Sequence, residues 1–215
     1  MKKIIAMLLA LTVVLGLAAC GNDTAKDTTP ATTEPVVDTT PATEEVTEGT
    51  EEIIEDTIPA PATNGATDVI NAIWNAVPED NKFFAMGGDF NHIADNAAGV
   101  YDLADEGLTA TLLVPADQIA NIDEAASLMH AMMANNFTCG AFHVTGDKAA
   151  FVEAMHNAVQ NNRWMCGMPE KLIIAEIGQY VLVCFGINDA IAPFETALGT
   201  AYASANIKYN EAIVG

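Results

Sequence analysis

The sequence predicts an α+β fold: a two-layer sandwich of a mixed or antiparallel sheet with helices on one face, preceded by a disordered stalk. Two observations predict it. From residue 139 onward, apolar segments follow one another in the order strand, helix, strand, strand, helix, which favours an antiparallel or mixed sheet covered by helices. Residues 21–63 are instead rich in Thr, Pro, Glu and Asp, a composition that cannot build a core.

The first element of the predicted domain, residues 64–215, is a helix over about 68–77. Thr67 is a suitable N-cap residue, and Pro78 ends the helix. The apolar residues recur at three- and four-residue spacing, as they do on the buried face of a helix: Val69, Ile70, Ile73, Trp74 and Val77.

Three further elements are predicted in the middle of the domain. A short helix is placed at about residues 89–98, between glycine-containing loops. Residues 108–114 alternate Thr with apolar side chains and predict a strand. Asp123 can then cap a helix rich in Ala and Met, from residue 124 to about 135.

The last eighty residues give the clearest pattern. Asp147 is placed to cap a helix that follows a strand over residues 139–145. Gly178-Gln179 separates two apolar runs, which indicates a β-hairpin. The remaining predicted elements are the two hairpin strands, 172–177 and 180–185, and a closing helix from 188 to about 202.

The N-terminus has the layout of an export signal. Lys2 and Lys3 precede an apolar stretch, Ile4 to Leu17, that is shorter than the roughly 20 residues a membrane-spanning helix needs. Small residues then precede a cysteine, in Leu17-Ala18-Ala19-Cys20. This segment resembles the lipobox of bacterial lipoproteins, so residues 1–20 are predicted to be a lipoprotein signal peptide.

The lipobox resemblance implies that the thiol of Cys20 receives diacylglycerol and that the mature chain begins there. This covalent lipid is the one non-protein group we expect; no other cofactor is predicted. The chain would then be held to the membrane through the lipid anchor, on the extracytoplasmic face of the cell membrane. A structural cysteine that happens to follow a signal peptide is the alternative.

The negative charge of the chain limits the classes of partner that it can bind. The chain has a net charge of −21. Residues 21–63 hold eleven acidic residues and one basic residue, Lys26, so self-repulsion and scattered prolines predict an extended, disordered linker. Residues 64–215 remain acidic, with eighteen Asp and Glu against five Lys and Arg. This excess of acidic residues argues against nucleic acid as a binding partner, because phosphate binding needs clustered Lys and Arg.

Three cysteines follow Cys20, and an odd number argues against a disulfide scaffold. Cys184 lies in an apolar run and is expected to be a small buried side chain. A disulfide between Cys139 and Cys166 is possible if the helix after residue 147 brings the chain back to the start of the preceding strand. Three free thiols are the alternative.

A recurrent pattern of apolar runs and turn residues extends through the C-terminal half: Phe142-His143-Val144-Thr145-Gly146-Asp147, Phe151-Val152-Glu153-Ala154, Asn162-Arg163, Pro169-Glu170-Lys171-Leu172 and Gly178-Gln179-Tyr180-Val181-Leu182-Val183. It is similar to that of a family of Gram-positive, gut-anaerobe-type lipoproteins. The resemblance covers roughly residues 68–200. It implies a lipobox, a stalk and one small α+β domain of unknown function, without catalytic residues. The chain departs from the family at residues 153–165, where asparagines replace charged residues.

Thioether, thiol and imidazole groups, the ligands that suit Cu(I), are frequent between residues 129 and 168. The candidate metal ligands are Met129, His130, Met133, Cys139, His143 and Cys166, with Met132, Met165 and Met168 nearby in the sequence. The competing interpretation places the methionines of the predicted helix on its core-facing stripe, where methionine is a packing residue. We favour the core interpretation, under which no metal is bound.

No catalytic constellation is found. The histidines lack the spacing of a metalloprotease, and only two serines occur, Ser127 and Ser204. Asp102, Asp105 and Glu106 lack the order of a calcium-binding hand and indicate a solvated turn.

We therefore expect a non-enzymatic binding or interaction module at the cell envelope, with an unknown envelope protein or ligand as its partner. A soft-metal binding lipoprotein is the alternative. A two-lobed solute-binding protein is disfavoured, because residues 64–215 are enough for only one typical domain.

Overall fold

The computed structural model describes residues 63–214. The predicted signal peptide with Cys20 and nearly all of the predicted linker lie outside these residues. The strands are β1 (Ala85–Gly87), β2 (Ala94–Asp95), β3 (Gly99–Val100), β4 (Ile122–His130), β5 (Phe137–Val144), β6 (Lys171–Ile177), β7 (Tyr180–Gly186) and β8 (Asn206–Ala212). The helices are α1 (Ala66–Ala76), α2 (Gly107–Ala110), α3 (Lys148–Gln160) and α4 (Asn188–Ala201), with 3-10 turns η1 (Glu79–Asn81), η2 (Ile119–Asn121) and η3 (Ala134–Asn136).

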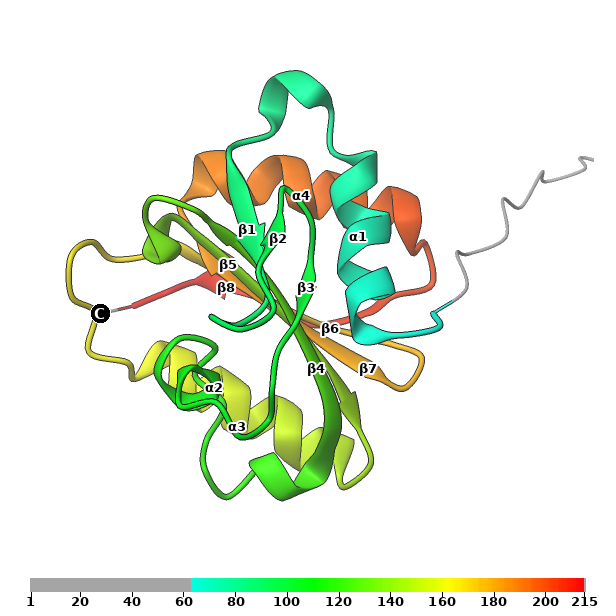
Figure 1. The fold of residues 1–215 in the computed structure, drawn as a ribbon, viewed down its shortest axis with the longest axis vertical. Coiled ribbons are helices and arrows are strands. Elements are labelled where there is room, and N and C mark those ends of the chain that lie inside the picture. Colours follow the sequence, from blue (N-terminus) through cyan, green and yellow to red (C-terminus); the bar gives the residue numbers. More distant parts are fainter. Residues whose placement is uncertain (1–62, 215) are drawn as a thin grey trace, which may run out of the picture. The chain divides into compact units, whose positions relative to one another are not determined.

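The strands form one sheet in which every neighbouring pair is antiparallel. Its order is β2-β1-β4-β5-β7-β6-β8, with β3 paired to β4 beside β1. Figure 1 shows α1 and α4 on one side of this sheet and α2 and α3 on the other. The α+β class and the antiparallel sheet are thus confirmed.

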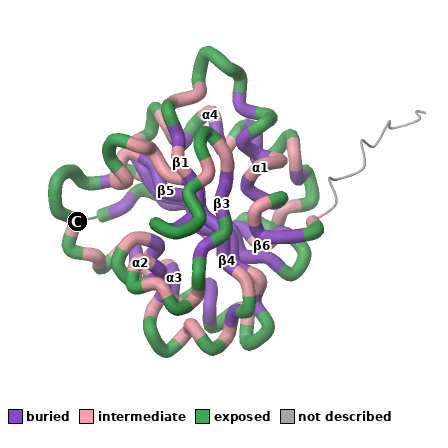
Figure 2. Tube along the Cα trace, viewed as in Figure 1, coloured by how far each residue is buried: buried purple, intermediate pink, exposed green. Residues whose placement is uncertain are grey.

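The helices cover both faces of the sheet, which corrects the expected two-layer arrangement to three layers. In β7, Leu182 and Cys184 pack in the cluster that contains α1 and α4. Their neighbours Val181 and Val183 pack against the buried face of α3. Side chains alternate between the two faces of a strand, so both faces of β7 are covered. Figure 2 shows buried residues along the centre of the sheet.

Several elements form where local sequence and packing agree. Helix α1 buries the expected apolar face, although its N-cap is Gly65 rather than Thr67. The first turn is capped instead by a residue far away in the sequence: the Glu124 carboxylate accepts a hydrogen bond from Ala66 N at 2.8 Å. The predicted cap of α3 is confirmed: the Asp147 carboxylate accepts hydrogen bonds from Ala149 N and Ala150 N at 3.0 and 3.1 Å.

The predicted C-terminal hairpin is confirmed as β6 and β7, which pair from Ile177↔Tyr180 to Lys171↔Gly186. Gly178 in the turn has a φ of +59°, a left-handed conformation that glycine adopts without steric cost. Strand β5 and helix α4 also lie where the apolar pattern predicts them.

Three predictions for the middle of the domain are wrong. The residues predicted as a helix from 124 to about 135 instead form most of β4, up to His130, and the turn that follows it, because pairing with β5, β1 and β3 outweighs the local helix preference. The predicted strand over 108–114 is instead α2 followed by irregular chain, and the predicted helix over 89–98 is a loop containing β2. Strand β8 was not predicted, since it is mostly exposed and polar.

Candidate binding groove

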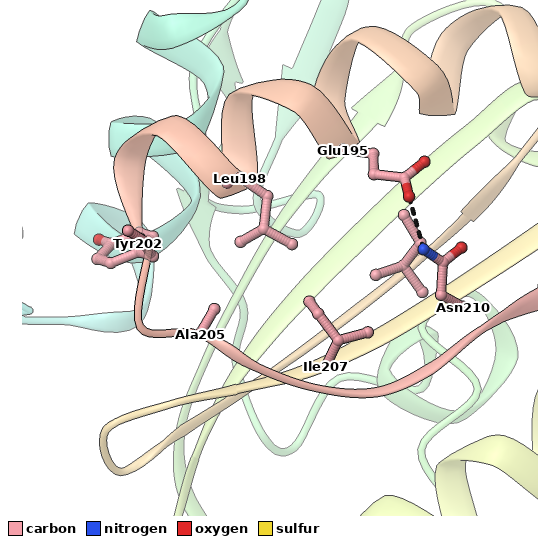
Figure 3. Close-up of a pocket in the computed structure, with 9 residues that line it drawn as sticks. Glu195, Leu198, Tyr202, Ala205, Ile207 and Asn210 are labelled. Atoms are coloured by element: carbon pink, nitrogen blue, oxygen red, sulfur yellow. Dashed lines mark hydrogen bonds between the residues drawn. The ribbon is translucent and has the colours of Figure 1, made fainter.

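A groove of about 310 Å³ lies between α4 and the edge strand β8. Figure 3 shows α4 side chains on one side of it and β8 side chains on the other. One face of α4 carries Glu195 and Leu198, which lie three residues apart. Tyr202, the C-cap residue, follows four residues later on the same side. The lining residues are Ile173, Glu195, Leu198, Gly199, Tyr202, Ala203, Ala205, Ile207 and Asn210.

A β-bulge brings the β8 residues onto the same face. Ile207 pairs with Ala175, while Tyr209 pairs with Ile174 on the neighbouring strand, so Lys208 is an extra residue without its own partner. The extra residue shifts the alternation of side chains by one. Ile207 and Asn210, three residues apart, consequently both face the groove.

One end of the groove is polar. The Glu195 carboxylate accepts hydrogen bonds from Lys171 Nζ and Asn210 Nδ2, each at 2.5 Å. Burial alone would raise the pKa of Glu195, but these two hydrogen bonds and the charge of Lys171 lower it below its ordinary value. Glu195 is therefore ionised at neutral pH, and it is a poor general base because an effective base needs a pKa near the working pH.

The rest of the groove is apolar. Leu198 and Tyr202 are buried, whereas Ile207 is 44% exposed along the open side. The hydroxyl of Tyr202 points away from Glu195 in Figure 3 and has no hydrogen-bond partner among residues 63–214. Burial raises the pKa of this hydroxyl, so it stays neutral. The groove thus offers an apolar surface with an ion-paired carboxylate at one end.

A second organised site lies in the loop after β1. The buried Asp89 carboxylate accepts backbone hydrogen bonds from Asn91 and His92, at 2.7 and 3.0 Å, and from Asp102 at 2.7 Å. His92 Nδ1 lies 2.9 Å from the same carboxylate. Burial alone would raise the pKa of Asp89, but these hydrogen bonds lower it below its ordinary value of 3.8. The hydrogen bond that His92 donates to Asp89 in turn raises the pKa of His92 above its ordinary value of 6.5.

An Asp–His pair of this kind can orient a general base when a nucleophile is within reach. The nearby hydroxyl of Ser127 is fully buried, accepts a hydrogen bond from Gly88 N and donates one to Gly88 O. It is thus held by backbone, and the pair has a structural role in shaping the loop. The available sequence signal was Asp89 itself, because aspartate side chains commonly accept hydrogen bonds from the backbone two residues on, as Asp89 does from Asn91.

The candidate metal ligands predicted from the sequence do not converge. Cys139 is fully buried, while His143, four residues along the same strand, lies roughly 13 Å away by the rise of a strand. Met129 lines a different cavity, together with Met86 and Tyr101. His130 Nδ1 accepts hydrogen bonds from Met132 N and Met133 N, at 3.2 and 3.3 Å, which leaves the hydrogen of the neutral ring on Nε2.

The three cysteines of the described residues are free thiols. Cys139 lies opposite Cys184 on the neighbouring strand, and both are buried. Burial, followed by the hydrogen bond with Cys139, raises the pKa of the Cys184 thiol well above its ordinary value. Cys166, the expected disulfide partner of Cys139, is exposed in the loop before β6.

Comparison of the chain with protein-family models, curated proteins and solved structures finds no match. Within residues 63–214, no helix has both the length and the apolar character needed to cross a bilayer.

Proposed function

We propose that this chain is a lipid-anchored extracytoplasmic module that binds a small amphipathic ligand in the groove between α4 and β8. The groove carries the proposal, because it combines an apolar floor with a fixed polar end at Glu195 and Asn210. Ligand sites in proteins are commonly such concave apolar surfaces with a few placed polar groups. The lipobox around Cys20 and the acidic linker support the envelope location.

The geometry favours binding over catalysis. Glu195 is already paired with Lys171, and its lowered pKa leaves no proton to give at neutral pH. The pair still accepts and donates hydrogen bonds. A primary amide complements it, since its N–H groups can donate to Glu195 while its carbonyl oxygen accepts from Lys171 or Asn210. A short aliphatic chain would then cover Leu198 and Ile207.

A homologous series of linear amides, butanamide to octanamide, tests the groove in an NMR titration of the full-length chain. Signals of Leu198 and Ile207 should shift, and each added methylene should tighten binding about fourfold until the groove is full, since a buried methylene contributes about 0.8 kcal/mol. Ile207→Asp should abolish the shifts. Val100→Asp, at a comparably exposed apolar position on β3, is the matched control and should bind normally. Equal binding by the two variants would refute the groove as the site.

A further inference from the structure

Two loops at one end of the sheet present a group of sulfur-containing side chains to solvent. One is the turn after β4, with Met132 and Met133, and the other is the segment before β6, with Met165, Cys166 and Met168; we call these five residues the sulfur patch. The methionines are 84, 44, 75 and 43% exposed, respectively, and Cys166 is exposed as well. Figure 1 shows both loops, in green and yellow, at the same edge of the fold.

Specific contacts hold the two loops together. Asn135 Nδ2 donates hydrogen bonds to Met165 O and Gly167 O, both at 2.7 Å. Met133 Sδ lies 3.8 Å from the position that a Cβ on Gly167 would occupy. Cys166 and Gly167 both have positive φ, +63° and +115°, so the chain turns sharply at the cysteine. Residues thirty apart in the sequence therefore meet at the sulfur patch.

Ordinary packing does not account for this arrangement. Methionine normally fills gaps in a core, as Met155 does here with complete burial. Four exposed methionines on the two joined loops, one of which carries the exposed Cys166, instead offer flexible thioether donors that can rearrange around a ligand. Thioether sulfur has no proton to lose at physiological pH, so its availability does not depend on the acidity outside the cell.

We propose that the sulfur patch binds one Cu(I) ion through the thiolate of Cys166 and thioethers of the surrounding methionines. Soft sulfur ligands select Cu(I) over the harder divalent metals. Within residues 63–214 no three His, Cys, Asp or Glu side chains gather as a site for those metals. The negative charge of the chain attracts cations of any kind, and the sulfur donors supply the selectivity. Binding releases one proton, from the Cys166 thiol, and involves no change in oxidation state.

This assignment replaces most of the set suggested by the sequence. Cys139 and His143 are separated along β5, and His130 uses Nδ1 to accept two backbone hydrogen bonds. Met133 and Cys166 remain, joined by Met132, Met165 and Met168. The sulfur patch shares no lining residue with the groove between α4 and β8, so the two proposals stand or fall separately.

The full-length chain with Cys20→Ala, which removes a competing thiol, is titrated anaerobically with Cu(I) against a chromophoric Cu(I) chelator. One equivalent should bind. Replacing Met132, Met133, Met165 and Met168 together by Leu keeps the apolar surface but removes the thioethers. This variant should bind Cu(I) more than about tenfold more weakly. Loss of a residue that only hydrogen-bonds to a metal ligand already costs at least about tenfold in affinity, and here the ligands themselves are removed. Cys166→Ser should weaken Cu(I) binding comparably.

Two controls make the result specific. Met86→Leu and Met129→Leu remove thioethers outside the sulfur patch and should leave the affinity unchanged. In a Trp74→Phe background, the remaining indole of Trp164 precedes Met165 and should report binding of Ag(I), a redox-inert analogue, through a 1:1 change in fluorescence. The proposal is overturned if no stoichiometric Cu(I) binding occurs, or if the four-leucine variant binds Cu(I) as tightly as the parent.

Discussion

The buried carboxylate of Asp89 determines the course of the loop that follows β1. It accepts hydrogen bonds from three backbone N–H groups of this bend, those of Asn91, His92 and Asp102. A hydrogen bond to a charged group contributes about 1.5–3 kcal/mol, so this one side chain supplies much of the hydrogen bonding that regular secondary structure provides elsewhere. The imidazole of His92 adds a contact that depends on pH.

Asp89→Asn should lower the free energy of unfolding by about 1–3 kcal/mol, because an amide offers one acceptor oxygen where the carboxylate offers two. The loss should vary with pH. The pKa of Asp89 is lowered on folding, so its contribution is present above 3.8 and fades as the pH falls through the folded pKa. The pKa of His92 is raised, so its contribution is complete below 6.5 and fades above its folded pKa.

Urea unfolding of both proteins at pH 3, 5.5 and 9 measures this profile, and the difference between them should be largest at pH 5.5. Asp123→Asn is the matched control. Asp123 pairs with His143 Nδ1 at 2.5 Å, but its side chain is 60% exposed, and exposed ion pairs contribute little. If the loss of unfolding free energy in Asp89→Asn stays constant from pH 3 to pH 9, neither the charge of the Asp89 carboxylate nor that of His92 contributes to stability.

Secondary-structure elements were predictable where local propensity and tertiary packing agree. Helix α3 has an N-cap aspartate, and the hairpin of β6 and β7 has a glycine at the turn, so each carries its own boundary signal. Strand β4 has the opposite character. Its Ala- and Met-rich sequence favours a helix locally, but pairing with β5 and burial of Ala126 and Leu128 override that preference.

The N-cap of α3 gives a test at this scale. Asp147→Ala should lower the free energy of unfolding by about 1 kcal/mol, because two backbone N–H groups lose their acceptor. For a chain of this size, that corresponds to a drop in melting temperature of roughly 2–4 °C. Asp147→Asn keeps a side-chain acceptor and should be close to the parent in a calorimetric scan. Equal losses in the two variants would mean that the hydrogen bonds of the cap contribute nothing.

The number of layers and the groove were harder to predict, for different reasons. The continuous apolar run from Tyr180 to Phe185 was the available signal for helices on both faces, since a strand with one solvated face alternates. The groove had no comparable signal. It depends on the polar strand β8 and on the bulge at Lys208, and neither follows from the local sequence. Likewise, the two loops of the sulfur patch meet only through the tertiary structure.

The placement of the whole molecule rests on the lipid proposed for Cys20. Two acyl chains would hold the chain firmly, since each buried methylene contributes about 0.8 kcal/mol.

Growth of a bacterial host with labelled palmitate tests the anchor. The parent chain should incorporate the label and partition with membranes, and mass spectrometry should find its N-terminus at Cys20. Cys20→Ala should incorporate none and should keep residues 1–19, because the modified cysteine is what the processing step recognises. Cys166→Ala, which removes the exposed thiol of the folded domain, should be labelled and processed like the parent. Label in Cys20→Ala would place the attachment elsewhere, and no label in the parent would mean that no lipid is attached, which would remove the basis for an envelope location.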